Sequence, residues 1–302
     1  MSRGRILVIR GGAIGDFILT LPALAALRKQ FPRTQLAVLG YPHLAALAEL
    51  GGGVNEVRSI EARALASFFA RRGDLDAALG EWFGGFNIIV SYLYDPDEIF
   101  QENVARVSKA QFIAGPHRPN EAENVHATDV FLKPLERLAI FDADPVPRLP
   151  INSQPTTINT LALHPGSGSE KKNWPEARWQ ELLRRMAAET NWRVLLVGGE
   201  AEGQRLQRLA TLLPIDRFSV AMHQPLPELA RALAACGAFL GHDSGITHLA
   251  AAAGLRGVAL WGATNPNIWR PRSDQFELLR EERGLAHLEP ARVLTTLRHL
   301  MK

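Results

Sequence analysis

Seven short apolar runs alternate with amphipathic stretches along the whole chain, and this alternation constrains the fold more than any other feature. The runs are continuously apolar, which is typical of strands buried on both faces of a parallel sheet. Stretches with a helical period lie between them, as at 21–31, 174–190 and 225–237. The pattern predicts an α/β fold with doubly wound parallel sheets. The runs are RILVIR (5–10), QLAVLG (35–40), NIIVSY (87–92), TLALHP (160–165), WRVLLVGG (192–199), AFLGHD (238–243) and GVALWG (257–262).

The length of 302 residues leaves room for two domains of roughly 150 residues each. The alternating pattern restarts after a proline-rich stretch over 142–157 that has no helical period. We therefore expect an N-terminal Rossmann-like domain over 1–145, a linker at about 146–157 and a C-terminal Rossmann-like domain over 158–302. In such folds the ligand binds at the carboxyl ends of the strands, here expected in the cleft between the halves.

Composition narrows the classes of partner. The net charge of +3 suits an anionic ligand or membrane surface, but no block of Lys and Arg marks a nucleic-acid-binding face. The single cysteine, Cys236, excludes an intrachain disulfide and is expected to fill the core. The histidines have no metal-binding spacing, and no apolar segment approaches the ~20 residues of a membrane-spanning helix. We expect a cytoplasmic protein with no nucleic-acid partner, metal or cofactor.

The first motif is RGGAIGDFILTLPAL, at 10–24. Gly11 and Gly12 allow a tight turn after the first strand, and Gly15 lets the backbone approach a ligand closely. Asp16 then falls at the start of a helix, where its carboxylate either acts as a general base toward a hydroxyl or simply caps the helix. The fingerprint G-x-G-x-x-G is absent, which disfavours an ordinary dehydrogenase.

The second motif is HPGSGSEKKNWPEARW, at 164–179. Ser167 and Gly168 belong to a loop rich in N–H and O–H donors, and Lys172 adds positive charge in front of a helix that opens with Pro175. Such a loop suits a diphosphate, although it is not a Walker loop. The alternative is an ordinary polar surface loop.

The third motif is VGGEAEGQRL, at 197–206, in which a strand ends in two glycines and Glu200 and Glu202 follow. A carboxylate at this place can accept hydrogen bonds from ribose hydroxyls or hold a base. The alternative is that both are acids placed at a helix start, where the helix dipole favours negative charge.

The fourth motif spans 237–269, where an apolar strand runs into Asp243, Ser244 and Gly245 and an alanine-rich helix follows at once. The free N–H groups at such a helix start bind phosphate. Asp243 would repel a diphosphate unless it binds a sugar hydroxyl or orients the turn. His248, in the first turn of the helix, either contacts a phosphate or packs under the turn.

The four motifs, in this order, resemble glycosyltransferase family 9, the ADP-heptose:lipopolysaccharide heptosyltransferases and their relatives. The resemblance implies a GT-B fold, which has two facing Rossmann-like domains, and a reaction that requires no metal. It also implies transfer of heptose from ADP-heptose with inversion at the anomeric carbon. By position, it assigns the catalytic base to Asp16, the phosphate loop to Ser167 and Gly168, the diphosphate lysine to Lys172, the ribose ligand to Glu202 with Glu200 left open, and the nucleotide-sugar turn to Asp243, Ser244, Gly245 and His248.

The acceptor implied by the resemblance is a lipopolysaccharide core or related lipid-linked or cell-surface glycan. The protein would then work at the cytoplasmic face of the inner membrane, as a soluble or peripheral protein whose N-terminal domain handles the acceptor. Many family members have a short polar stretch before an Arg-Ser pair where this chain has the acidic segment LYDPDEIFQENVARV (93–107), so the acceptor stays open. His117 and Arg118 line the acceptor cleft or are ordinary loop residues. The alternatives are a GT-B hexosyltransferase or epimerase and a non-catalytic nucleotide-sugar binder.

Overall fold

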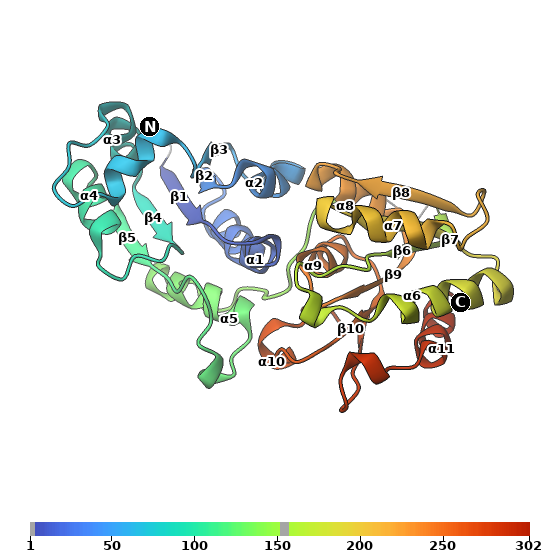
Figure 1. Ribbon diagram of the computed structural model, residues 1–302. Coiled ribbons are helices and arrows are strands. Elements are labelled where there is room, and N and C mark those ends of the chain that lie inside the picture. The colour runs from blue at the N-terminus through green and yellow to red at the C-terminus, as the bar shows by residue number, and fades with distance from the viewer. Residues whose placement is uncertain (1–3, 152–156) are drawn as a thin grey trace. The chain divides into compact units, whose positions relative to one another are not determined.

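The computed structural model describes residues 4–151 and 157–302 of the chain. The chain divides into two compact units, Met1–Pro147 and Arg148–Lys302, and each is built on one sheet (Figure 1). Residues 152–156 of the predicted linker lie outside the described residues. Every paired strand in both sheets is parallel, so the predicted doubly wound α/β class is confirmed.

The first unit has a five-stranded sheet in the order β3-β2-β1-β4-β5, the order of a Rossmann fold. The chain leaves β1 toward β2 on one side and leaves β4 toward β5 on the other, so the switch point lies between β1 and β4. Its elements are β1 (Arg5–Arg10), α1 (Ile14–Gln30), β2 (Gln35–Gly40), α2 (Pro42–Glu49), β3 (Glu56–Ser59), α3 (Ala77–Gly84), β4 (Ile88–Ser91), α4 (Ile99–Val107), β5 (Gln111–Ala114) and α5 (Ala127–Leu132).

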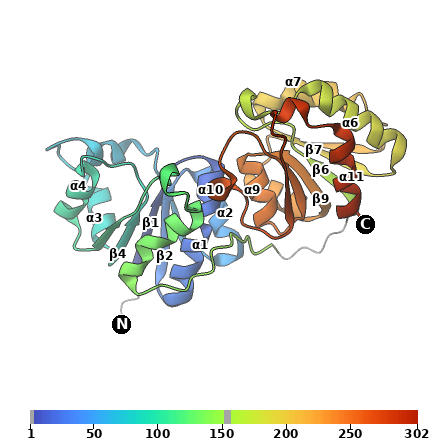
Figure 2. The same ribbon diagram turned by 90° about the horizontal axis from the view of Figure 1, so that it is seen from below.

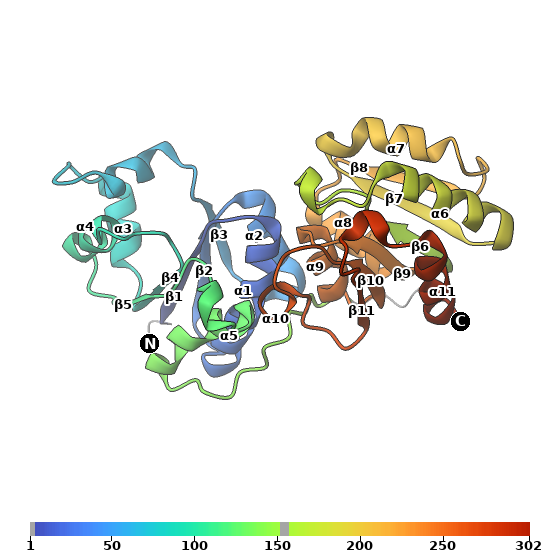
Figure 3. The same ribbon diagram turned by 60° about the horizontal axis from the view of Figure 1, so that its bottom comes forward.

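Helices cover both faces of this sheet. On one face α1 packs against α2 and α5, and on the other α3 and α4 pack together beside a 3₁₀ segment at Arg63–Phe69 (Figures 1 and 3). Leu7 and Ile9 of β1 lie on the face covered by α3 and α4, in one apolar cluster with Phe83 and Phe100. Apolar burial on both faces explains why β1 is a continuous apolar run.

The second unit has a six-stranded sheet in the order β11-β10-β9-β6-β7-β8. Counted from β6, this is again the Rossmann order, and the switch point lies between β6 and β9. Its elements are β6 (Thr157–Leu163), α6 (Glu176–Glu189), β7 (Arg193–Gly198), α7 (Gly203–Ala210), β8 (Phe218–Met222), α8 (Leu226–Ala234), β9 (Cys236–His242), α9 (Gly245–Ala252), β10 (Gly257–Leu260), α10 (Pro266–Trp269), β11 (Phe276–Leu279) and α11 (Pro290–Leu300).

A large apolar core lies between this sheet and the layer of α6, α7 and α11 (Figure 2). On the other face α8 and α9 pack together (Figure 3). The core contains Trp174 and Trp179, both fully buried. Cys236 is buried at the start of β9, as expected of a core residue. Within the described ranges, none of the helices combines the length and apolar character needed to cross a bilayer.

Candidate functional site

The switch point of the second unit gathers an unusual number of buried polar side chains. The chain leaves β6 at His164 and leaves β9 at Asp243, on neighbouring strands whose connections run to opposite sides. Buried polar groups must be hydrogen-bonded or they destabilise the fold, so their partners define how the site is built. The buried polar residues of this region are His164, Glu202, His242, Asp243, Ser244, Thr247 and His248.

Asp243 holds two side chains that come from other loops. Its Oδ2 accepts from Nζ of Lys172 at 2.7 Å and from Oγ1 of Thr264 at 2.6 Å. The aspartate is nearly buried, whereas the lysine side chain is 37% exposed. The ion pair therefore holds the lysine ammonium in place while part of the lysine side chain stays exposed to solvent. Asp243 thus orients a positive charge that a ligand can reach.

Ser244 begins α9 as its N-cap. Its Oγ accepts from the backbone N–H of Thr247 at 3.3 Å and lies 3.4 Å from Nδ1 of His164. The first N–H groups of the helix, beginning at Gly245, have no intrahelical acceptor and carry the positive end of the helix dipole. His248 lies one turn further on, buried, with its backbone N–H donating to Ser244 O at 3.3 Å.

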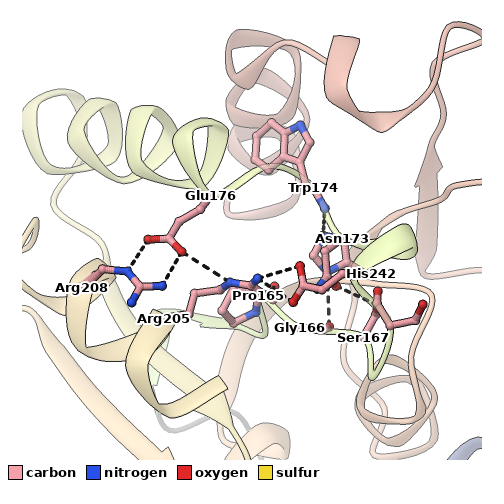
Figure 4. A network of polar contacts seen from close by, with 11 residues as sticks. Pro165, Gly166, Ser167, Asn173, Trp174, Glu176, Arg205, Arg208 and His242 are labelled. Carbon is pink, nitrogen blue, oxygen red and sulfur yellow. Dashed lines mark hydrogen bonds and ion pairs between the residues drawn. The ribbon is translucent and has the colours of Figure 1, made fainter. Parts of the chain in front are cut away.

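The loop that carries Ser167, Gly168 and Lys172 is tied to the sheet by His242 (Figure 4). The backbone N–H of Trp174 donates to Nε2 of His242 at 2.8 Å, so Nδ1 carries the ring proton and donates to Gly166 O at 3.2 Å. One imidazole thus binds both ends of the loop.

Arg205, on α7, holds the same loop from the side. Its Nη1 donates to Pro165 O at 3.1 Å, and its Nη2 donates to the Glu170 carboxylate at 3.0 Å. Glu176, at the start of α6, lies 3.7 Å from Nε of Arg205 and binds Arg208 through both oxygens (Figure 4). Arg208 holds the pKa of Glu176 below its ordinary value mainly through these hydrogen bonds.

Inside the loop, Ser167 Oγ lies 2.7 Å from Asn173 Oδ1 and 2.9 Å from Ser169 O. Gly168 is exposed and has a positive φ of 71°. This is a backbone conformation that glycine adopts without strain. The loop is therefore a preformed turn whose exposed tip is glycine.

Two of the buried histidines of this site, His164 and His242, are neutral near pH 7. Burial lowers the pKa of His242 to about 3, and its hydrogen bond with Gly166 opposes that effect. Burial also lowers the pKa of His164, where the Glu202 carboxylate opposes the effect and the Arg205 guanidinium adds to it.

The two glutamates of the third motif differ in their surroundings. Glu202 is buried, and its Oε2 accepts from the N–H of Gly199 at 2.9 Å. A Cβ built on Gly166 would lie 2.2 Å from Glu202 Oε1, so only glycine fits there. Glu200 is exposed. Of the two glutamates, Glu202 is therefore the one whose carboxylate reaches the loop at Gly166.

Asp16 lies in the first unit, in the first turn of α1. Its Oδ2 accepts from the N–H of Ala13 at 3.0 Å, and its side chain is 29% exposed. Gly12 has a φ of 96°, and a Cβ there would lie 2.8 Å from Asp16 Oδ2. The glycine turn after β1 thus leaves space for a carboxylate that the backbone orients.

Arg10 is a buried cation beneath Asp16. Its Nη2 lies 3.7 Å from Asp16 Oδ1 and donates to Asp16 O at 3.2 Å, while Nη1 donates to His117 O at 2.9 Å. The guanidinium also lies over the Phe131 ring, 4.3 Å from its centroid. Burial lowers its pKa from the ordinary value, and the Asp16 carboxylate opposes that effect.

The structure brings the second-unit candidates together at one switch point, while Asp16 lies at the switch point of the first unit. Sequence reasoning missed His242, Arg205 and Arg10, whose contacts cross long stretches of chain. All three lie inside the quoted motifs. Arg10 and His242 each end an apolar strand, and a polar residue at that place is a signal that points to them.

The acidic segment after β4 has a structural role at Asp95. Its carboxylate accepts from the N–H groups of Phe100 at 3.1 Å and Gln101 at 3.0 Å, in the first turn of α4. Asp97 pairs with Arg71 at 3.5 Å in an exposed ion pair.

In the described residues no group of three or more His, Cys, Asp or Glu side chains is placed to hold a metal ion.

Comparison with solved structures defines the class of fold. The glycosyl transferase family 9 protein from Veillonella parvula superposes with a TM-score of 0.79 at 19% identity, covering 100% of this chain and 98% of that one. E. coli heptosyltransferase WaaC with ADP gives a TM-score of 0.76 at 18% identity over 98% and 99% of the two chains. The protein therefore has the GT-B fold of these enzymes.

The sequence of the second unit matches a family model. Residues 147–292, which make up most of this unit, match glycosyltransferase family 9 (heptosyltransferase). Lipopolysaccharide heptosyltransferase 1 of Pseudomonas aeruginosa is 38% identical over 136 residues, which cover 44% of this chain and 34% of that protein. The matched segment thus spans about a third of the length of that relative.

Proposed function

We propose that the protein is an inverting glycosyltransferase that transfers heptose from ADP-heptose to a lipopolysaccharide core or a related cell-surface glycan. The observation that carries the proposal is the Lys172–Asp243 ion pair at 2.7 Å, next to the Ser244-capped start of α9. The match of residues 147–292 to the family model supports this proposal. Relatives named lipopolysaccharide heptosyltransferase and a similar structure solved with ADP support it as well.

The second unit binds the donor in this proposal. The N–H groups at Gly245, the Ser167–Gly168 turn and the Lys172 ammonium hold the diphosphate, because together they offer donors and positive charge in a partly buried setting. Glu202 accepts hydrogen bonds from the ribose hydroxyls. His248 contacts the nucleotide-sugar from the first turn of α9.

Asp16 is the general base in this proposal. Its carboxylate takes the proton of the acceptor hydroxyl as that oxygen attacks the anomeric carbon, and the bond from this carbon to the β-phosphate oxygen breaks. ADP leaves with its new negative charge stabilised by Lys172 and the start of α9. One displacement inverts the anomeric configuration, and these groups take the place of a metal ion.

The acceptor is a lipid-linked or free glycan handled by the first unit, and the protein acts at the cytoplasmic face of the inner membrane. Contact with that membrane is peripheral in this proposal. The mild positive charge of +3 supports an attraction to an anionic surface.

The test begins with calorimetric binding of ADP, UDP, GDP and ADP-heptose. We expect selective binding of ADP and ADP-heptose, undiminished by a chelator, followed by transfer to core oligosaccharide with inversion detected by NMR. Preference for UDP or GDP would instead favour a GT-B hexosyltransferase or epimerase. Binding without turnover on any acceptor would favour a non-catalytic binder.

Asp16→Asn separates the base from the contact that caps α1, because the amide oxygen of Asn can still accept from the N–H of Ala13. We expect it to lower kcat at least about a hundredfold while leaving the Kd for ADP unchanged. Asp76→Asn is the matched control, since Asp76 caps α3 in the same unit by accepting from Leu79 N–H at 2.9 Å. Equal activity of both variants would refute the role of Asp16.

A further inference from the structure

Tyr94 exposes an aromatic ring to solvent on the loop after β4. Its side chain is 68% exposed, and its ring meets that of His117 at a centroid distance of 4.6 Å and an interplanar angle of 61°. Tyr92, two residues earlier, is buried, with its hydroxyl donating to Phe131 O at 2.6 Å. The loop therefore buries Tyr92 inside the unit and exposes the ring of Tyr94 to solvent, where it contacts the His117 ring.

The pair lies at the edge of the sheet that carries Asp16. In the first unit β4 pairs with β1 on one side and with β5 on the other, all parallel, so their carboxyl ends share one edge. Asp16 follows β1, Tyr94 follows β4 and His117 follows β5. This is the edge at which doubly wound folds bind ligands, beside the switch point between β1 and β4.

Arg10 connects the aromatic pair to the aspartate. Its guanidinium donates to His117 O at 2.9 Å and lies 3.7 Å from Asp16 Oδ1. The histidine that supports Tyr94 and the carboxylate are thus held by one buried side chain. Their relative placement is fixed by a rigid group with a planar donor geometry.

The backbone beside Tyr94 is also anchored. The neighbouring Asp95 accepts from Phe100 N–H at 3.1 Å and Gln101 N–H at 3.0 Å, which ties the loop to the first turn of α4. An exposed ring on an anchored loop binds with little ordering cost, because the surface is preorganised.

We propose that Tyr94, supported by His117, is a platform on which a sugar ring of the acceptor stacks. The C–H face of a pyranose packs on an aromatic face, and the phenol hydroxyl offers a hydrogen bond to a sugar hydroxyl. The platform and Asp16 follow neighbouring strands at the same edge of the sheet, so in this proposal a ring bound on Tyr94 presents a hydroxyl toward the carboxylate. This inference rests on the proposed function for the identity of the sugar as acceptor.

The probe is core oligosaccharide released from lipopolysaccharide, and its binding is measured by saturation-transfer NMR titration without donor. We expect Tyr94→Ala to weaken binding about three- to tenfold, Tyr94→Phe to retain most of it and His117→Ala to give an intermediate loss. In transfer assays, Tyr94→Ala raises the KM for oligosaccharide and leaves kcat and the Kd for ADP unchanged.

Phe141→Ala is the matched control, because Phe141 is 70% exposed and belongs to the same unit. It lines one hollow with Gln30, at the C-terminal end of α1, and another with Arg118, and within the described residues its ring is not paired with Tyr94 or His117. We expect this variant to bind oligosaccharide as the wild type does. A uniform loss in both alanine variants would indicate a general surface effect and overturn the platform.

The outcomes also separate the platform from the proposed function. Wild-type protein that binds the oligosaccharide through Tyr94 but transfers no heptose would refute the proposed function and keep the platform. Transfer that proceeds with unchanged binding and KM in Tyr94→Ala would overturn the platform and keep the function. Failure of the wild type to bind the oligosaccharide would also overturn the platform.

Discussion

The backbone N–H of Trp174 donates to Nε2 of His242 at 2.8 Å across a separation of 68 residues. The other ring nitrogen of His242 donates to Gly166 O at 3.2 Å. Because the two partners flank the turn that carries Ser167 and Lys172, a single buried imidazole sets the position of that turn on the sheet.

His242→Ala should therefore affect both stability and ligand binding. It leaves a buried N–H and a buried carbonyl without a partner and opens a cavity beside Trp179, so we expect a loss of about 2–5 kcal/mol in the free energy of unfolding. We also expect ADP affinity to fall about tenfold as the loop loosens. Urea unfolding and calorimetry measure the two effects.

His287→Ala is the control for this variant, because His287 is exposed in the same unit. His242→Gln, whose amide oxygen can accept from Trp174 N–H, should recover part of the affinity. Full ADP affinity in a destabilised His242→Ala protein would mean that Arg205 and its contacts position the loop without the imidazole.

Because His164 and His242 are buried and neutral, we expect the free energy of unfolding to fall in mild acid. Burial holds the pKa of folded His242 at about 3 against 6.5 for the free side chain, and the pKa of His164 is lowered as well. The unfolded chain therefore binds protons that the folded chain does not. The stabilisation is complete above pH 6.5 and is lost as the pH falls toward the folded values, by about 1.4 kcal/mol per pH unit for each histidine.

Urea unfolding at pH 7, 6 and 5, followed by tryptophan fluorescence, measures this slope. The signal reports mainly on the second unit, since all tryptophans except Trp82 lie there. We expect His242→Gln to show a shallower pH dependence than the wild type, and His287→Ala to follow the wild type. Equal slopes for wild type and His242→Gln would contradict a neutral His242.

The two glutamates of the third motif give a direct comparison. Glu202 is buried against Gly166, whereas Glu200 is exposed. We expect Glu202→Gln to weaken ADP binding about tenfold, because the carboxylate is the stronger acceptor for ribose hydroxyls, and Glu200→Gln to leave it unchanged. The reverse order in calorimetry would assign the ribose to Glu200.

The sequence predicted the interior strands and missed the edges. The seven apolar runs correspond to β1, β2, β4, β6, β7, β9 and β10, all of which have a neighbour on both sides. The strands without a prediction, β3, β5, β8 and β11, are the four edges of the two sheets. Edge strands are partly exposed, so their side chains need not form a continuous apolar run.

The same limit applies to the site. Motifs such as Asp243-Ser244-Gly245 are contiguous, so the sequence indicates a strand, a cap and a helix in one place. The contacts of Arg10 with His117 and of Arg205 with Pro165 span 107 and 40 residues, and no local pattern encodes them. Which of Glu200 and Glu202 is buried depends on where the loop before Trp174 lies, which only the fold determines.

Gly12→Ala tests whether the turn after β1 serves Asp16. A Cβ at Gly12 meets Asp16 Oδ2 at 2.8 Å, and the φ of 96° is itself unfavourable for alanine. Gly284 has nearly the same φ, 93°, but a Cβ there meets nothing within 4 Å. We expect both alanine variants to lose about 1–3 kcal/mol of unfolding free energy from backbone strain, whereas only Gly12→Ala displaces the carboxylate and lowers kcat. A comparison of urea midpoints and transfer rates checks this, and equal kcat in the two variants would show that the orientation of Asp16 does not limit the reaction.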